Sequence, residues 1–292
     1  MVRTDTGRRA AVLGSPVAHS LSPVLHDAAY QALGLTGWSY QRVECDADRL
    51  PGLVSELDEQ WVGLSVTMPG KQAALAVASS VTDRAAVVGA ANTLTRMDSG
   101  LWRADCTDVD GVTGALDAAG ARVSADGPAV ILGAGGTANA AIAALPGLGI
   151  DRVLVVAREP ARAAEAVACA GRAGVHCEVL RWADVDFGPL AAESALLVNT
   201  APGAALETIV DALAKARRIL DVIYHPWPTP LAEAVHERGG SLATGLDMLL
   251  HQAFGQVEQF TGQPAPRVAM RDALRAATGD VLSLPLAQPQ DP

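Results

Sequence analysis

The stretch Val130-Ile131-Leu132-Gly133-Ala134-Gly135-Gly136-Thr137-Ala138 decides the fold predicted for this chain. Its short apolar run is typical of a buried strand, which passes into a glycine-rich turn and then into an alanine-rich segment that favours a helix. Glycine-rich turns join many strands to helices, but this spacing also fits the G-x-G-x-x-G/A turn that holds the pyrophosphate of a dinucleotide at a helix N-terminus. We therefore expect a dinucleotide site whose contacting residues are Gly133, Ala134, Gly135, Gly136, Thr137 and Ala138.

Short apolar runs alternate with helix-favouring segments on both sides of this turn. The predicted strands span residues 10–14, 38–43, 61–66, 130–132, 153–157, 196–198 and 219–223. Strands joined through helices run parallel, so the pattern predicts an α/β fold with two doubly wound sheets. A hairpin turn is expected at residues 96–102, a helix at 108–120 and a long amphipathic helix at 245–260.

The bulk composition indicates a protein that handles small molecules. A chain of 292 residues can form two modest domains, and its formal net charge of -10 repels nucleic acid and anionic membrane surfaces. No apolar run reaches the roughly 18 residues of a membrane-spanning helix. The four cysteines lack CxxC spacing and the six histidines lack HxxxH or HExxH spacing, so neither disulfides nor a metal site is expected. We expect a cytoplasmic protein.

Charged residues follow the predicted strand at 153–157, where dinucleotide-binding domains distinguish NAD from NADP. An acid here would bind the 2′-hydroxyl of NAD, and Glu159 offers one. Arg158 and Arg162 instead match the 2′-phosphate of NADP, because guanidinium groups make charge-assisted, bidentate hydrogen bonds with phosphate. The alternative is that all three are solvated charges at a helix start. We expect NADP, while Glu159 leaves NAD open.

Polar residues interrupt the apolar strands of the first half of the chain. Ser20 and Ser22 follow the first strand, although Ser22 before Pro23 is also typical of a helix N-cap. Lys71 lies in the loop after the third strand, where α/β sheets carry binding sites, whereas a lone lysine is most often a surface charge. Asp108 opens a helix and by itself could be an N-cap.

Taken together, these segments resemble the shikimate dehydrogenase family along nearly the full length of the chain. The matching motifs, in order, are Ser20-Leu21-Ser22, Val66-Thr67-Met68-Pro69-Gly70-Lys71, Gly89-Ala90-Ala91-Asn92-Thr93, Thr107-Asp108, Gly133-Ala134-Gly135-Gly136 and Gly245-Leu246-Asp247-Met248-Leu249-Leu250-His251-Gln252. The resemblance implies an N-terminal substrate-binding domain, completed by C-terminal helices, and a Rossmann NADP-binding domain, with a cleft between them. We expect residues 1–106 with 245–292 in the former and residues 107–244 in the latter.

The resemblance also implies an activity, the reversible NADP(H)-dependent reduction of 3-dehydroshikimate to shikimate in chorismate and aromatic amino acid biosynthesis. Lys71 would exchange the proton of the C3 oxygen, which requires an amine that loses its proton near neutral pH, and Asp108 would orient that amine. The substrate-binding residues implied are Ser20, Ser22, Thr67, Lys71, Asn92, Thr107, Asp108, Tyr224 and Gln252. Further cofactor contacts are implied for Ala157, Thr200, Ala201, Val222, Gly245 and Met248.

Departures from the family's motifs leave alternatives open. Cys106 stands where the family has Asn before Thr-Asp, so a polar anchor beside Asp108 is missing. Ala157-Arg158-Glu159 replaces Asn-Arg-Thr, and residues 199–203 follow the family's Asn-Thr-Thr-Pro loop only in part. The alternatives are a quinate or aminoshikimate dehydrogenase, for which NAD as well as NADP is open as the cofactor, and a non-catalytic ligand-binding regulator. Retention of both Lys71 and Asp108 argues against the regulator, and a monomer or homodimer is expected.

Overall fold

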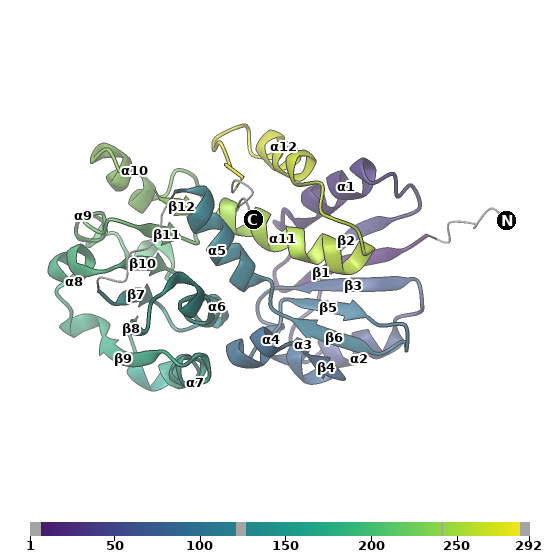
Figure 1. Ribbon diagram of the computed structural model, residues 1–292, viewed down its shortest axis with the longest axis horizontal. Helices are drawn as coiled ribbons and strands as arrows, with labels where there is room; N and C mark the ends of the chain where they lie inside the picture. The colour runs from purple at the N-terminus through teal and green to yellow at the C-terminus, as the bar shows by residue number, and fades with distance from the viewer. Residues whose placement is uncertain (1–6, 121–126, 241, 287–292) are drawn as a thin grey trace. The chain divides into compact units, whose positions relative to one another are not determined.

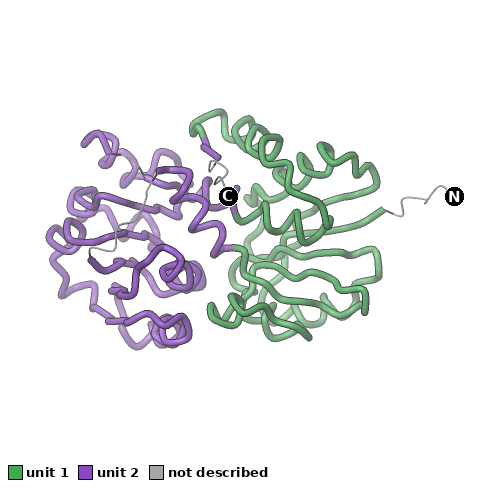
Figure 2. Tube along the Cα trace, viewed as in Figure 1, with its two compact units in different colours: residues 1–107, 252–283 green, residues 108–251, 284–292 purple. Residues whose placement is uncertain are grey.

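Two separate six-stranded sheets organise the chain in the computed structural model, which describes residues 7–120, 127–240 and 242–286. The chain divides around these sheets into unit 1, residues 1–107 and 252–283, and unit 2, residues 108–251 and 284–292 (Figure 2). The predicted α/β fold with two sheets is confirmed. Among the described residues, no helix combines the length and the apolar character that crossing a bilayer requires.

Unit 1 is built on the sheet with strand order β2-β1-β3-β5-β6-β4 (Figure 1). Its elements are β1 (Arg9–Gly14), α1 (Ser22–Ala32), β2 (Ser39–Glu44), α2 (Leu50–Glu56), β3 (Trp61–Val66), α3 (Lys71–Val77), β4 (Ser80–Val81), α4 (Asp83–Val88), β5 (Thr93–Arg96), β6 (Trp102–Asp105), α12 (Arg267–Ala277) and the later part of α11 (Gly245–Thr261). β1 runs parallel to β2 and β3, whereas β5 is antiparallel to β3 and β6. The hairpin predicted at residues 96–102 therefore introduces an antiparallel strand into this sheet.

Alternation along β1 separates the two apolar layers of unit 1. Ala11 and Leu13 are buried in a cluster with Leu50 of α2 and Ala74 of α3. Their neighbours Ala10 and Val12 belong to a second cluster, with Tyr30 of α1 and Phe260 of α11. Helices α1 and α11 consequently pack on one side of the sheet, and α2 and α3 contribute to the other.

Unit 2 has the strand order β12-β11-β10-β7-β8-β9, and all of its strand pairs are parallel. Its elements are α5 (Asp108–Ala118), β7 (Ala129–Leu132), α6 (Gly136–Ala144), β8 (Arg152–Ala157), α7 (Ala164–Ala173), β9 (His176–Arg181), α8 (Phe187–Glu193), β10 (Leu196–Asn199), α9 (Val210–Leu213), β11 (Ile219–Asp221), α10 (Pro230–Glu237), β12 (Ala243–Thr244) and the first part of α11. Ile131 of β7 packs in a cluster with α5, α6 and α7, while Leu132 packs in a cluster with α8, α9 and α10.

The strands that the sequence predicts are confirmed, with ends that shift by at most two residues. The predicted helices at residues 108–120 and 245–260 correspond to α5 and α11. Strand β9 was not predicted, because its residues alternate between exposed and half-buried at the edge of the sheet and carry no apolar run. β4 and β12, with two residues each, are too short to give a periodic signal.

Candidate active site

Lys71 is the first residue of α3 and is half-buried. Its backbone carbonyl accepts a hydrogen bond of 2.9 Å from the N–H of Ala91. The next residue, Asn92, accepts a 2.8 Å bond from the N–H of Val66 through its own carbonyl. These two bonds join the loop after β3 to the segment before β5, so Lys71 and Asn92 occupy neighbouring segments of unit 1.

The two serines near the start of α1 interact with each other and with β2. The Ser20 hydroxyl donates to the Ser22 oxygen over 3.2 Å, and the guanidinium of Arg42 donates to the Ser20 carbonyl at 2.6 and 2.9 Å. Helix α1 begins at Ser22 itself, and its N-cap is Leu21 without a side-chain cap bond. The interpretation of Ser22 as an ordinary N-cap is therefore wrong, and its hydroxyl oxygen accepts the bond from Ser20 instead.

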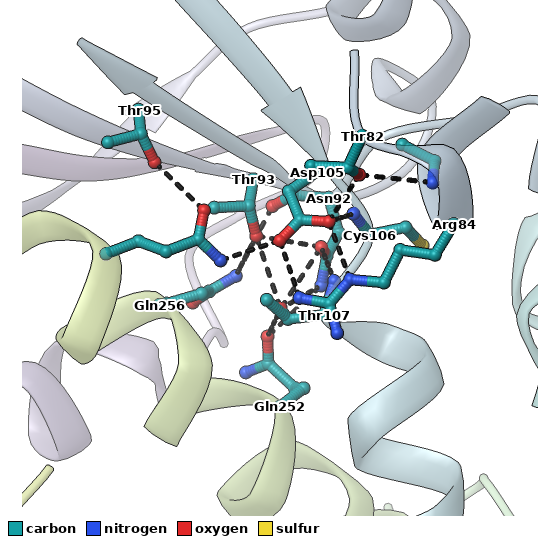
Figure 3. A network of polar contacts seen from close by, with 12 residues as sticks. Thr82, Arg84, Asn92, Thr93, Thr95, Asp105, Cys106, Thr107, Gln252 and Gln256 are labelled. Atoms are coloured by element: carbon teal, nitrogen blue, oxygen red, sulfur yellow. Dashed lines mark hydrogen bonds and ion pairs between the residues drawn. The ribbon is translucent and has the colours of Figure 1, made fainter. Parts of the chain in front are cut away.

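Asn92, Thr107 and Gln252 form a buried cluster in unit 1 (Figure 3). The Asn92 side-chain amide donates to the Thr107 hydroxyl at 3.0 Å and to the Gln252 side-chain oxygen at 3.2 Å. In return, the Asn92 Oδ1 accepts the Thr107 N–H at 2.8 Å. The structure thus brings together three of the predicted substrate-binding residues, which lie far apart along the chain.

The donors and acceptors of this cluster are assigned by its hydrogen bonds. Both hydrogens of the Asn92 Nδ2 are donated inside the cluster, and its Oδ1 also accepts the Thr93 hydroxyl at 2.8 Å. Gln252 uses its Oε1 toward Asn92, which directs its Nε2 donors the opposite way. The side-chain amides of Asn92 and Gln252 are therefore fixed relative to each other.

Gln256, one turn along α11 from Gln252, extends the cluster deeper into unit 1 and was not predicted. Its Oε1 accepts the Ser65 hydroxyl at 2.7 Å and lies 3.2 Å from the His26 Nε2. Its Nε2 donates to the Thr93 hydroxyl at 3.2 Å. The amide is therefore held at both ends, and it can take only one of its two orientations.

Tyr40 closes the network on the side of α1. Its hydroxyl donates to Ser65 at 2.7 Å, and its ring stacks on His26 with centroids 4.0 Å apart. Burial raises the pKa of Tyr40, and the hydrogen bonds with Ser65 and Ser22 oppose that effect. In the sequence, only the spacing of Gln252, Gln256 and Gln259 points to this set of hydrogen bonds, because it places all three glutamines on one face of a helix.

In unit 2, the predicted dinucleotide turn lies between β7 and α6. Gly133 has a φ of +106°, and a Cβ on it would collide with the Thr200 hydroxyl, so only glycine suits this position. That hydroxyl donates to the Leu132 carbonyl at 2.7 Å. The turn is consequently shaped by contact with the loop after β10, which also contains Ala201.

The start of α6 has the form that a pyrophosphate site requires. Gly135 is the N-cap, makes no side-chain cap bond and faces open space, where a Cβ would meet no atom within 4 Å. Gly136, Thr137 and Ala138 form the first turn, whose N–H groups have no partner within the helix. These residues fit a phosphate group, since the backbone can approach it and the helix dipole favours its charge.

Other predicted cofactor residues lie near the ends of β11 and β12. A Cβ on Gly245 would collide with the Val222 carbonyl and lie 2.9 Å from the Tyr224 ring, so these three residues are in close contact. Met248 is buried in the cluster that Val222 also joins. Burial raises the pKa of Tyr224.

The arginines that follow β8 are exposed. Arg158 comes directly after Ala157, the last residue of the strand. Arg162 pairs with Glu159 at 2.9 Å, with 80% and 63% of the two side chains exposed. An ion pair this exposed contributes little energy, so it offers weak competition to a phosphate dianion.

Asp108 is the first residue of α5 and is buried in unit 2. It follows Thr107 directly, so one peptide bond separates it from the Asn92 cluster of unit 1. Asp221, the last residue of β11, is another buried acid of unit 2, and it accepts hydrogen bonds from the Asn199 amide at 2.9 Å and the Thr229 hydroxyl at 2.7 Å. Those bonds fix the loop that carries Thr200.

Comparison with known proteins identifies the family. The model of the shikimate dehydrogenase substrate binding domain matches residues 12–94, and that of the shikimate 5'-dehydrogenase C-terminal domain matches residues 245–275. A shikimate dehydrogenase (NADP(+)) of Roseobacter denitrificans is 37% identical over 279 residues, which cover 92% of this chain and 96% of the relative. The chain belongs to the shikimate dehydrogenase family.

Solved structures of this family and its relatives share the fold. A shikimate 5-dehydrogenase from Mycobacterium fortuitum matches with a TM-score of 0.82 and 54% identity, over 91% of this chain and 97% of that one. A quinate dehydrogenase from Corynebacterium glutamicum, in complex with NAD, matches with a TM-score of 0.81 and 26% identity, over 92% and 99%. The shikimate dehydrogenase resemblance expected from the motifs is confirmed.

Because the imidazole of His26 is buried, we expect the stability of the protein to depend on pH. Burial lowers the pKa of His26 from 6.5 to about 3, and the hydrogen bond with Gln256 opposes it only in part. Folding therefore excludes a proton that the unfolded chain binds, so stability is complete above pH 6.5 and is lost as the pH falls toward 3. Relative to H26F, the wild type should lose roughly 1 kcal/mol per pH unit in this window.

Urea unfolding of both proteins at a series of pH values measures this difference. H26F keeps an aromatic ring against Tyr40 and removes the titrating nitrogen. Replacing the exposed His176 in the same way, H176F, should leave the pH slope of the wild type unchanged. Equal slopes for wild type and H26F would contradict the prediction.

Proposed function

We propose that the chain is a shikimate dehydrogenase that interconverts 3-dehydroshikimate and shikimate with NADP(H). The observation that carries the proposal is the buried Asn92–Thr107–Gln252 cluster beside the segment that holds Lys71. A site lined with fixed amides and hydroxyls selects a ligand with several ring hydroxyls, because an analogue that lacks them leaves buried polar groups unmatched. Membership of the family supports the same reaction.

Lys71 is the proton carrier in this proposal. In the direction of oxidation its neutral amine takes the proton of the C3 hydroxyl, and in reduction its ammonium returns a proton to the C3 oxygen. Asp108 fixes the orientation of the amine. Ser20, Ser22 and Tyr224 bind the carboxylate side of the ring, and Thr67 with the cluster binds its hydroxyls.

NADP, when bound, supplies the hydride acceptor or donor. The turn at residues 133–138 holds its pyrophosphate, and Arg158 with Arg162 holds its 2′-phosphate. Thr200, Ala201 and Val222, together with Gly245 and Met248, line the remainder of the cofactor site. The domain assignment expected from the sequence, residues 1–106 with 245–292 for substrate and 107–244 for cofactor, is part of this proposal.

The test of the proposed function is a spectrophotometric assay of the purified protein at the absorbance of the reduced nicotinamide. Shikimate and quinate are each offered with NADP and with NAD. We expect the highest kcat/KM with shikimate and NADP. Preference for quinate with NAD would favour the second candidate, a quinate dehydrogenase, and absence of turnover with binding of shikimate would favour a ligand-binding regulator.

Replacement of Lys71 tests its role as proton carrier. Because general acid–base catalysis contributes about a hundredfold to ten-thousandfold, K71A should lower kcat by that order with a modest change in KM. K71R retains the positive charge but cannot deprotonate near neutral pH, so it should lose as much. Steady-state kinetics with shikimate measure both variants.

The control comes from the composition of the chain, which has two lysines, Lys71 and Lys215. Lys215 is exposed in unit 2, and K215A should keep the wild-type rate. Full activity of K71R would show that a positive charge suffices and would remove proton transfer from the role of Lys71.

Replacement of Arg158 tests the choice of cofactor. Hydrogen bonds to a charged group contribute about 1.5 to 3 kcal/mol, so R158A should weaken NADP binding about tenfold to a hundredfold and leave NAD nearly unaffected. Fluorescence titration of the reduced cofactors measures both affinities. Arg152, exposed at the opposite end of β8, is the matched control, and R152A should change neither. Equal losses for the two cofactors in R158A would defeat the phosphate assignment.

A further inference from the structure

Asp105, the last residue of β6, carries a carboxylate that is 3% exposed and accepts five hydrogen bonds. Arg84 donates to both oxygens, at 2.6 and 2.5 Å. The Thr82 hydroxyl and the Gln259 amide donate at 2.7 Å each, and the Cys106 N–H donates at 2.8 Å. This carboxylate therefore connects β6 with the start of α4 and with α11 (Figure 3).

These contacts lower the pKa of the Asp105 carboxyl group. Burial alone would raise the pKa of Asp105, but the hydrogen bonds from Arg84 and Thr82 and the charge of Arg84 outweigh it and lower the pKa to about 2. The carboxylate is thus charged throughout the neutral range. A charged group with this many donors resists rotation, because every orientation other than the native one leaves donors unmatched.

Two successive backbone N–H groups after β6 end on side-chain acceptors. The Cys106 N–H donates to the Asp105 carboxylate and the Thr107 N–H donates to the Asn92 Oδ1, each at 2.8 Å. Both N–H groups of the segment between β6 and α5 therefore have side-chain acceptors, and these acceptors, Asp105 and Asn92, are fixed by further hydrogen bonds. The sequence led us to expect that Cys106 removes a polar anchor from this segment, and the structure supplies one from the preceding residue.

We propose that Asp105 is a positioning residue of this enzyme. Its carboxylate fixes the backbone of Cys106 so that Thr107 stays in the Asn92 cluster. Asp105 itself touches neither substrate nor cofactor in this scheme. The catalytic consequence rests on the proposed function, whereas the consequence for the backbone does not.

The deciding variant is D105N. It is nearly isosteric and keeps the Oδ1 acceptor for Cys106, but it places an amide group opposite the donors of Arg84 and Gln259. Since small displacements of a catalytic group can cost about a hundredfold, kcat/KM for shikimate should fall about tenfold to a hundredfold in D105N and further in D105A. The KM for NADP should change less than about twofold, because the cofactor residues are not linked to Asp105.

A second measurement separates positioning from general stability. Deuterium uptake by the peptide that contains Cys106 and Thr107 should rise in D105N, while uptake by the strands β1 and β3 stays at the wild-type level. The matched control is D272N, whose partner Arg271 lies 2.8 Å away in an exposed ion pair of the same unit. It should change neither exchange in this peptide nor kcat/KM.

The outcomes are distinct. A folded D105N with wild-type kcat/KM and unchanged exchange at Cys106 and Thr107 overturns the proposal. If D105N does not fold, the pair Q259L and T82V, each of which removes one donor, decides in its place: raised exchange in the same peptide supports the proposal and unchanged exchange overturns it. Absence of shikimate turnover in the wild type would defeat the proposed function, and the exchange measurement would still decide the role of Asp105.

Discussion

The side chain of Asn92 is the contact on which the arrangement of unit 1 depends. Its oxygen and its nitrogen both reach Thr107, and its nitrogen also reaches Gln252. A buried amide that loses its partners costs on the order of 1 to 3 kcal/mol for each unmatched group. Three segments distant in sequence are thereby held at one point, and a small polar ligand would meet a surface that is already organised.

The glutamines of α11 extend this constraint along the sheet. Gln252, Gln256 and Gln259 recur at spacings of four and three residues, which places them on one face of the helix. Gln256 binds Ser65 and Thr93, and Gln259 binds Asp105. An apolar face would permit the helix to slide or rotate with little penalty, whereas a face of satisfied amides accepts a single register. Specific placement of α11 is thus obtained from polar contacts inside the core.

Features of local origin could be predicted from the sequence, and features that depend on long-range contacts could not. The strand β7, the glycine turn and the helix α6 are formed by adjacent residues, so all three could be predicted from the local sequence. Ser65 and Gln256 lie 191 positions apart, and nothing in either neighbourhood indicates the other. Ser22 illustrates a different error: the local rule favoured a cap, but α1 begins at Ser22 itself, and its hydroxyl oxygen accepts a hydrogen bond from Ser20.

The proposed sites of the two units also differ in which groups form them. This difference explains why the motif of unit 2 could be interpreted from the sequence more fully than those of unit 1. In the cofactor site proposed for unit 2 the backbone would make the contacts, so the requirement is small residues at fixed places, as Gly133 and Gly135 illustrate. In unit 1 polar side chains form the proposed substrate site. Their orientation depends on neighbouring residues, and a different residue can take the place of such a neighbour if it makes the same hydrogen bond. The anchor at Asp105 follows this logic: the N–H of Cys106 needs an acceptor, and chemistry does not require that the acceptor come from position 106.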